Sequence, residues 1–278
     1  MGDSDAMSPN ANRGFDTARA LKHLGVTEGD RLLVHSSLRL LGWVDGGADA
    51  VIDAMQAAVG HSGTIMMPAF TFPPAEIFDP AGTPTTMGAI SETFRSRPDV
   101  TRSIHPTHSV AIWGADRDRL AAAHETATAL GLGSPVHLIL EEGGDIILLG
   151  VGHWANSAVH VAEAIARVPY LDIPYSDQYA HVLRARLPDG SLAQFPPKEN
   201  PGCSINFTAV EQPLKEEGLI TYYRDGGALV QRVSGRGLLT TIPRLLSKDP
   251  LFLLCSWDLC PFCPKVKDLF KYTQSGEV

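Results

Sequence analysis

The chain has 278 residues, of which 44% are hydrophobic and 19% charged, a composition typical of a globular protein with a sizeable core. Its formal net charge of −8 disfavours a nucleic-acid partner, because that binding depends on basic side chains that neutralise phosphates. No apolar run approaches the roughly 20 residues that cross a bilayer, and the N-terminus lacks the features of a secretory signal. We predict a cytoplasmic protein with no membrane partner and a flexible tail at residues 1–13.

The first half of the chain alternates between helix and strand patterns. Amphipathic helices are predicted at 15–26, 48–60, 87–97 and 116–125. Short apolar strands are predicted at 31–35, 63–70, 109–114 and 145–150. Segment 71–85 contains four prolines, so a long loop is expected there rather than a helix or a central strand.

The pattern changes after residue 170. Residues 179–195 form two alternating runs around Pro188, Asp189 and Gly190, which is typical of a β-hairpin. Helices are predicted at 206–218 and 237–250, and a strand at 225–235. Short strands between helices indicate a sheet covered on both faces. We therefore predict a single three-layer α/β/α domain with a mixed sheet and an inserted antiparallel hairpin region.

Polar residues lie beside two of the predicted strands. The strand at 31–35 ends at His35 and is followed by Ser36 and Ser37. Ligands of open α/β folds collect at such strand ends. This loop can hold the pantetheine or pyrophosphate of a coenzyme A, although an ordinary serine-rich turn explains it equally well. His105 and His108 lie just before the strand at 109–114. No acidic residue or cysteine nearby completes a metal site, which leaves a polar pocket wall or a satisfied structural pair.

A third motif, GVGHWANSAVHVAEAIARVPY, spans residues 150–170. A helix that begins near Asn156 or Ser157 places His160 in its first turn and Glu163 on the same face. A histidine beside a carboxylate suits a general base for acyl transfer from a thioester to an amine. The pattern alone is weak, because a buried histidine bonded to a helix neighbour is more common.

Taken in order, VHSSL, MPAFTF, HPTHSVAIWG, LGSPV and SAVHVAEAIARVPY resemble the aminoglycoside 3-N-acetyltransferase family, which is distinct from the GNAT acetyltransferases. The resemblance covers about residues 15–170 closely and 200–264 loosely. It implies acetyl transfer from acetyl-CoA, in a ternary complex, to the 3-amino group of a 2-deoxystreptamine aminoglycoside, and hence antibiotic resistance. The acetyltransferase domain would span 14–278, with an inserted substrate-side segment at about 171–205 and a cysteine-containing tail at 251–278.

The resemblance also implies roles for individual residues. His160 would be the general base, and Glu163 would orient it or meet the substrate cation. Ser157 stands near the expected acetyl carbonyl, where the family often carries threonine, and Glu199 is the candidate for a downstream acid. Contacts to acetyl-CoA are expected from His35, Ser36, Ser37, Leu38, Thr71, Ser103, His105, His108 and Ser109. Four carboxylates are expected to bind the cationic substrate: Glu76, Asp79, Asp172 and Asp177. No metal is expected to be required for catalysis.

The cysteines lie away from this proposed site. Cys255, Cys260 and Cys263 are spaced Cys-x4-Cys-x2-Cys, and with Cys203 or a histidine they could bind zinc, although the spacing favours unligated thiols. A cysteine-free site disfavours an acetyl-cysteine intermediate.

Three alternatives remain open at this point. The chain could be an acyl-CoA transferase for a non-antibiotic amine, or a zinc-stabilised interaction module. A serine hydrolase using Ser36 or Ser37 lacks the G-x-S-x-G motif. We expect a monomer or a homodimer.

Overall fold

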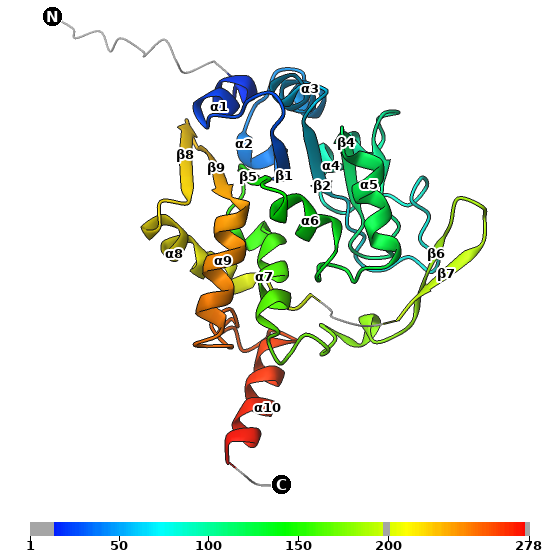
Figure 1. Ribbon diagram of the computed structural model, residues 1–278, viewed down its shortest axis with the longest axis vertical. Helices are drawn as coiled ribbons and strands as arrows, with labels where there is room; N and C mark the ends of the chain where they lie inside the picture. Colours follow the sequence, from blue (N-terminus) through cyan, green and yellow to red (C-terminus); the bar gives the residue numbers. More distant parts are fainter. Residues whose placement is uncertain (1–13, 197–200, 276–278) are drawn as a thin grey trace, which may run out of the picture.

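A computed structural model describes residues 14–196 and 201–275, so the predicted tail at 1–13 and the candidate acid Glu199 lie outside the described residues. A seven-stranded mixed sheet has the order β3-β4-β2-β1-β5-β9-β8 (Figure 1). The strands are β1 (Arg31–Ser36), β2 (Thr64–Pro68), β3 (Thr101–Arg102), β4 (Val110–Gly114), β5 (Asp145–Leu149), β8 (Ile220–Asp225) and β9 (Ala228–Ser234). β1 pairs in parallel with β2 and β5, and all other pairs are antiparallel.

Helices cover both faces of this sheet. The first face carries α1 (Thr17–His23), α2 (Leu38–Leu41), α3 (Gly47–Val59) and α4 (Ala89–Arg95). The second face carries α5 (Arg117–Ala122), α6 (Pro135–Glu141), α7 (Ala158–Ala166), α8 (Glu211–Glu216) and α9 (Gly235–Leu246). Among the latter, α5, α6, α7 and α9 lie side by side (Figure 1). α10 (Cys263–Ser275) ends the described chain.

Strand alternation explains the two layers. Along β1, Leu32 and Val34 pack in the core of the first face, whereas Leu33 packs in the core of the second. All three side chains are fully buried, as expected for a central strand between two helical layers. The predicted three-layer fold with a mixed sheet is confirmed. Within the described ranges, no helix combines the length and the apolar character that a membrane span needs.

Two features of the C-terminal half differ from the predicted elements. The single strand expected at 225–235 is the turn and second strand of a hairpin, in which Gly226 and Gly227 connect β8 to β9. Gly226 has a φ of +57°, the left-handed conformation that tight two-residue hairpin turns need. The helix expected at 206–218 begins as a 3-10 helix, η4 (Ile205–Val210), before α8.

The predicted β-hairpin is present as a separate two-stranded sheet of β6 (Leu183–Arg186) and β7 (Leu192–Phe195). It docks on the proline-rich loop 71–85 through Phe78. The Phe78 N–H donates to the Arg184 carbonyl at 2.9 Å, and the Arg186 N–H donates to the Phe78 carbonyl at 2.8 Å. The Phe78 ring is fully buried beneath the guanidinium of Arg102, 4.7 Å from the ring centre. The hairpin and the loop therefore form one connected unit.

The start of β2 and the end of β4 approach closely at two glycines. Gly114 has a φ of +105°, and a Cβ built there would lie 2.1 Å from the carbonyl oxygen of Gly63. We predict that Gly114→Ala lowers the free energy of unfolding by about 1–3 kcal/mol more than Gly218→Ala does. Gly218 is a matched control, because its φ is +70° and nothing lies within 4 Å of the added Cβ. Urea unfolding of both variants measures the difference, and equal losses would contradict a steric cause.

Candidate active site

A cavity of about 870 Å³ opens where the parallel strands end. Its walls come from the segments that follow β1, β2 and β5, together with residues before α4 and in η4. This is the edge at which open α/β folds bind ligands. The cavity brings together seven of the predicted site residues: His35, Ser36, Ser37, Leu38, His108, Ser157 and His160.

His160 lines this cavity, and it pairs with Glu163, which is buried behind it. The His160 Nδ1 atom lies 2.6 Å from Glu163 Oε2, and the Tyr170 hydroxyl donates to Glu163 Oε1 at 2.8 Å. Glu163 is 2% exposed, so both of its oxygens depend on these partners. Burial raises the pKa of Tyr170, and the Glu163 charge raises it further, so the hydroxyl keeps its proton. With Nδ1 donating to the carboxylate, Nε2 is the basic nitrogen of the ring.

The phenyl ring of Phe207 covers His160 from the side. The two ring centres are 4.6 Å apart in an edge-on arrangement, and Phe207 is fully buried. Phe207 reaches this position from η4, which places an apolar wall beside the imidazole. Sequence reasoning missed both Tyr170 and Phe207.

A second histidine holds the start of α7. His35 Nε2 accepts the backbone N–H of Ser157 at 3.0 Å and lies 2.9 Å from the Ser157 hydroxyl oxygen. Burial, together with the neighbouring His153, lowers the pKa of His35 to about 3, so the ring is neutral near pH 7. A neutral ring with a free lone pair on Nε2 is the form that this contact requires.

The other predicted polar residues lie behind the cavity wall. His105 Nδ1 accepts the His108 N–H at 3.0 Å, and the Ser103 hydroxyl is 2.7 Å from His124 Nδ1. Neither His105 nor Ser103 is among the residues that line the cavity, whereas His108 is. His108 also packs 4.7 Å from the ring of Phe70. Ser103, His105 and His124 thus form a layer of hydrogen-bonded side chains behind His108, which lines the cavity.

Thr71 and Ser109 bond to Arg102, a residue that sequence reasoning did not single out. The Arg102 guanidinium donates to Ser109 Oγ at 3.0 Å and to Thr71 Oγ1 at 3.2 Å. It also donates to the Ala69 carbonyl at 2.6 Å and to the carbonyls of Pro80 and Thr83. Burial lowers the pKa of Arg102 to about 10. Arg102 thus fixes the loop 71–85 to the edge of the sheet, using Thr71 and Ser109 as acceptors.

The predicted substrate carboxylates lie outside the cavity. Glu76 pairs with Arg184 at 3.4 Å and Asp79 with Arg186 at 3.8 Å, so both join the loop to the hairpin. Asp172 and Asp177 are exposed on the segment between α7 and β6. Among the described residues, no aspartate or glutamate lines the 870 Å³ cavity.

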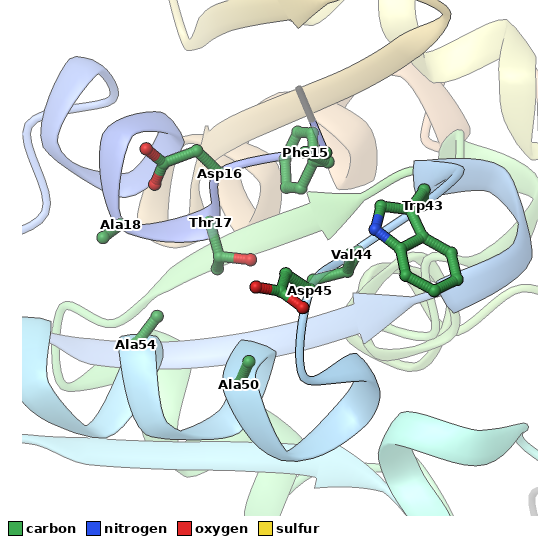
Figure 2. A pocket seen from close by; sticks show the side chains of 10 residues that line it. Phe15, Asp16, Thr17, Ala18, Trp43, Val44, Asp45, Ala50 and Ala54 are labelled. Atoms are coloured by element: carbon green, nitrogen blue, oxygen red, sulfur yellow. The ribbon is translucent and has the colours of Figure 1, made fainter. Parts of the chain in front are cut away.

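A second hollow, of about 610 Å³, lies between the start of α1 and α3 (Figure 2). Phe15, Trp43 and Val44 supply its apolar side chains, and Asp16 and Asp45 are its carboxylates. None of the predicted site residues lines it. The chemistry-bearing residues therefore converge on the cavity around His160.

Comparison with known proteins assigns the chain to a family. The sequence profile described as Aminoglycoside 3-N-acetyltransferase matches residues 33–247. An aminoglycoside N(3)-acetyltransferase IV from Salmonella is 36% identical over 236 residues, which cover 84% of this chain and 87% of the relative. The chain belongs to the aminoglycoside 3-N-acetyltransferase family, and the predictions of the family and of the enzyme class are confirmed.

Solved structures agree with this assignment. The apoenzyme of aminoglycoside acetyltransferase AAC(3)-IVa has a TM-score of 0.80 and 32% identity, over 93% of this chain and 98% of that one. A histidine-to-alanine variant of that enzyme in complex with a gentamicin has a TM-score of 0.77 and 33% identity, over 90% and 94% of the two chains. AAC-IIIb, solved as a binary complex with CoASH, has a TM-score of 0.70 over 84% and 95%. Its identity of 23% shows a shared fold.

The buried histidines lead to a prediction about stability and pH. Burial lowers the pKa of each of five rings: His35 to about 3, His124 and His153 to about 4, and His105 and His108 well below 6.5. In the unfolded chain these rings bind protons near about pH 6.5. Below that pH the unfolded state therefore binds protons that the folded state does not bind, and the free energy of unfolding decreases as the pH falls.

We predict that the free energy of unfolding decreases from about pH 7 to about pH 5, by up to about 1.4 kcal/mol per pH unit for each ring. Urea unfolding at closely spaced pH values measures the slope. His124→Gln should make the slope shallower by the contribution of about one proton, whereas His61→Gln, at an exposed position, should leave it unchanged. A flat dependence in this window would show that the rings titrate normally.

Proposed function

We propose that the protein transfers the acetyl group of acetyl-CoA to the 3-amino group of 2-deoxystreptamine aminoglycosides, with His160 as general base. The observation that carries this proposal is that His160, in the wall of the large cavity, has its Nδ1 held at 2.6 Å by the carboxylate of Glu163, which is buried behind it. Family membership supports acetyl transfer, and the relative crystallised with a gentamicin supports the substrate class.

In the proposed reaction, His160 Nε2 removes a proton from the attacking amine as its nitrogen bonds to the thioester carbonyl carbon. The carbon–sulfur bond then breaks, and the imidazolium returns the proton to the departing sulfur, so that an amide and a thiol are formed. Glu163 stabilises the charged imidazolium and keeps the ring in the required tautomer. The Ser157 hydroxyl, at the start of α7, is proposed to donate to the carbonyl oxygen as negative charge develops there.

The residues present suit an acetyl-CoA molecule. The Ser36 hydroxyl is buried in the cavity wall without a hydrogen-bond partner, so it is available to a polar group of the ligand. Phe70, Phe72, Met87 and Leu130 give the cavity the apolar surface that a pantetheine chain can pack against. Arg39 lies at the same wall and can meet a phosphate.

Direct transfer in a ternary complex is favoured over an acetyl-enzyme. All four cysteines of the chain lie together in a separate buried cluster, and none of them lines the cavity. A covalent route would need a thiolate within reach of the thioester. Release of thiol from acetyl-CoA should therefore require the amine, and an aminoglycoside panel tests this dependence. Thiol release that is independent of every aminoglycoside would contradict the proposed acceptor.

His160→Ala is predicted to lower kcat by a factor of about 10² or more while CoA affinity changes little, because only the proton transfer is lost. Steady-state kinetics and calorimetric CoA titration measure the two effects. His61→Ala is the matched control, since this exposed histidine lies outside the cavity. Glu163→Gln should lower kcat by about tenfold or more, because the neutral amide no longer stabilises the imidazolium. Turnover near that of the wild type in His160→Ala would remove this residue from the mechanism.

The loop 71–85 and the 171–205 segment are proposed to form the substrate side of the site. If Glu76 and Asp79 attract the polycationic substrate, Glu76→Gln with Asp79→Asn should raise KM for aminoglycosides unequally across a panel and leave KM for acetyl-CoA unchanged. Arg184→Gln with Arg186→Gln removes the opposite charges from the same ion pairs and should lower the aminoglycoside KM.

The two double variants separate attraction of the substrate from a merely structural role. Because each double variant breaks the same two ion pairs, loss of hairpin docking alone would change activity in the same direction in both. An equal change in both would therefore refute the proposed role of the carboxylates. Melting temperatures check that the hairpin remains folded in each variant.

A further inference from the structure

The four cysteines of the chain converge on one point at the second face of the sheet. Cys203 comes from the segment before η4, and Cys255, Cys260 and Cys263 come from the stretch that leads into α10. Each residue is at most 4% exposed, and the four sulfur atoms all lie within 4.8 Å of one another. Sequence spacing alone favoured unligated thiols, because Cys-x4-Cys-x2-Cys is incomplete for a known zinc finger.

The geometry matches a tetrahedral thiolate site. The Sγ atoms of Cys203 and Cys255 are 3.8 Å apart. Four sulfurs at about 2.3 Å from a central zinc ion would be separated by about 3.8 Å. Small side-chain rotations bring the other sulfurs, which are within 4.8 Å, to the same spacing.

Backbone amides already point at these sulfurs. The Ile205 N–H donates to Cys203 Sγ at 3.4 Å, the Cys255 N–H to Cys263 Sγ at 3.3 Å, and the Cys263 N–H to Cys260 Sγ at 3.4 Å. Such donors orient ligands and offset the negative charge of thiolates. The Lys267 ammonium donates to the Cys255 carbonyl at 2.8 Å, so a positive charge also lies next to the cluster.

We propose that Cys203, Cys255, Cys260 and Cys263 bind one structural zinc ion. Four protein thiolates close the coordination shell, which is the pattern of a structural and not a catalytic site. Two disulfides are the competing use of four cysteines. A disulfide requires sulfurs about 2.05 Å apart, and it would use the cysteines in pairs and not as one group of four.

The zinc site would also hold the wall of the active-site cavity. Pro201, Gly202 and Ser204, which flank Cys203, line the cavity, as does Phe207, which packs on His160. Phe262 lies between Cys260 and Cys263 in the chain, and its ring centre is 6.0 Å from that of Tyr170, the partner of Glu163. The metal would therefore join two segments, one that packs on the proposed base through Phe207 and one that packs on Tyr170 through Phe262.

Metal content of the full chain tests the proposal directly. The protein is purified without a metal-binding tag and without added metal, and its metals are measured by mass spectrometry. We expect about one zinc per chain, released after about four thiols have reacted with a mercurial reagent. Growth with cobalt in place of zinc should give the absorption bands of a tetrahedral cobalt thiolate.

Variants locate the metal. Cys260→Ser and Cys263→Ser should each lower the zinc content about tenfold or more, because each removes one of four ligands. Ser256→Ala, at an exposed position on the same stretch, should retain the full content. If the cysteine variants do not fold, the metal content and the thiol count of the unmodified chain still show whether the four cysteines bind zinc.

Three results would overturn the proposal. The first is a folded, metal-free chain in which all four thiols react freely with an alkylating reagent. The second is a mass after alkylation that corresponds to two disulfides. The third is a zinc content of one per chain that persists in Cys260→Ser and Cys263→Ser. The metal measurement does not depend on acetyl transfer, so it stands apart from the test of His160. Removal of zinc from an active chain should additionally lower kcat, with the loss reversed on adding zinc.

Discussion

A buried carboxylate sets the main constraint on this candidate active site. Glu163 is almost fully enclosed, and each of its two oxygens has one donor, His160 Nδ1 and the Tyr170 hydroxyl. A charge removed from water is tolerated when it is fully hydrogen-bonded, so both donors must be in place at once. The chain satisfies this requirement just after α7. Arg167 adopts a left-handed φ of +51° and the Val168 N–H returns to the Glu163 carbonyl at 3.2 Å, which turns the chain so that Tyr170 comes back to Glu163.

Three segments that are distant in sequence meet around this pair. α7 carries His160 and Glu163, η4 contributes Phe207, and the stretch before α10 contributes Phe262 against Tyr170. The end of β1 lines the same cavity, and there His35 accepts the Ser157 N–H and so holds the start of α7. The imidazole is therefore positioned by tertiary packing from several directions, and its own helix supplies one of them.

The sequence predicted what depends on local pattern. The continuous apolar run of β1, helix periodicity and the His160–Glu163 spacing are all short-range signals, and the sheet with two helical layers followed from them. Residues that are far apart in the chain and meet only in the folded protein left no such signal in the sequence. Cys203 reaches Cys255 across 52 residues, and Arg167 gave no warning of its left-handed turn because it is not a glycine.

Chemically similar residues were also placed differently by the fold. Ser36 lines the cavity with its hydroxyl unpaired, whereas Ser103 and Ser109 are bonded to other side chains behind the wall. In the sequence all three are serines beside a strand. Only packing decides which hydroxyl stays unpaired and which bonds to a neighbouring side chain. The strand predicted at 225–235 covers the turn and β9 but omits β8, since a pair of glycines marks a tight turn as readily as a local irregularity.

The docking of the small hairpin has a consequence for how this protein can diverge. β6 and β7 share no strand pairing with the seven-stranded sheet, and they are attached to the loop 71–85 by two backbone hydrogen bonds to Phe78 and by surface ion pairs. Substitutions on the exposed face of the hairpin therefore leave the central core and the His160 pair untouched. Related proteins can therefore differ in the side chains of this hairpin while they keep the same sheet core and the same His160–Glu163 pair. The one requirement is that Phe78 stays packed beneath Arg102.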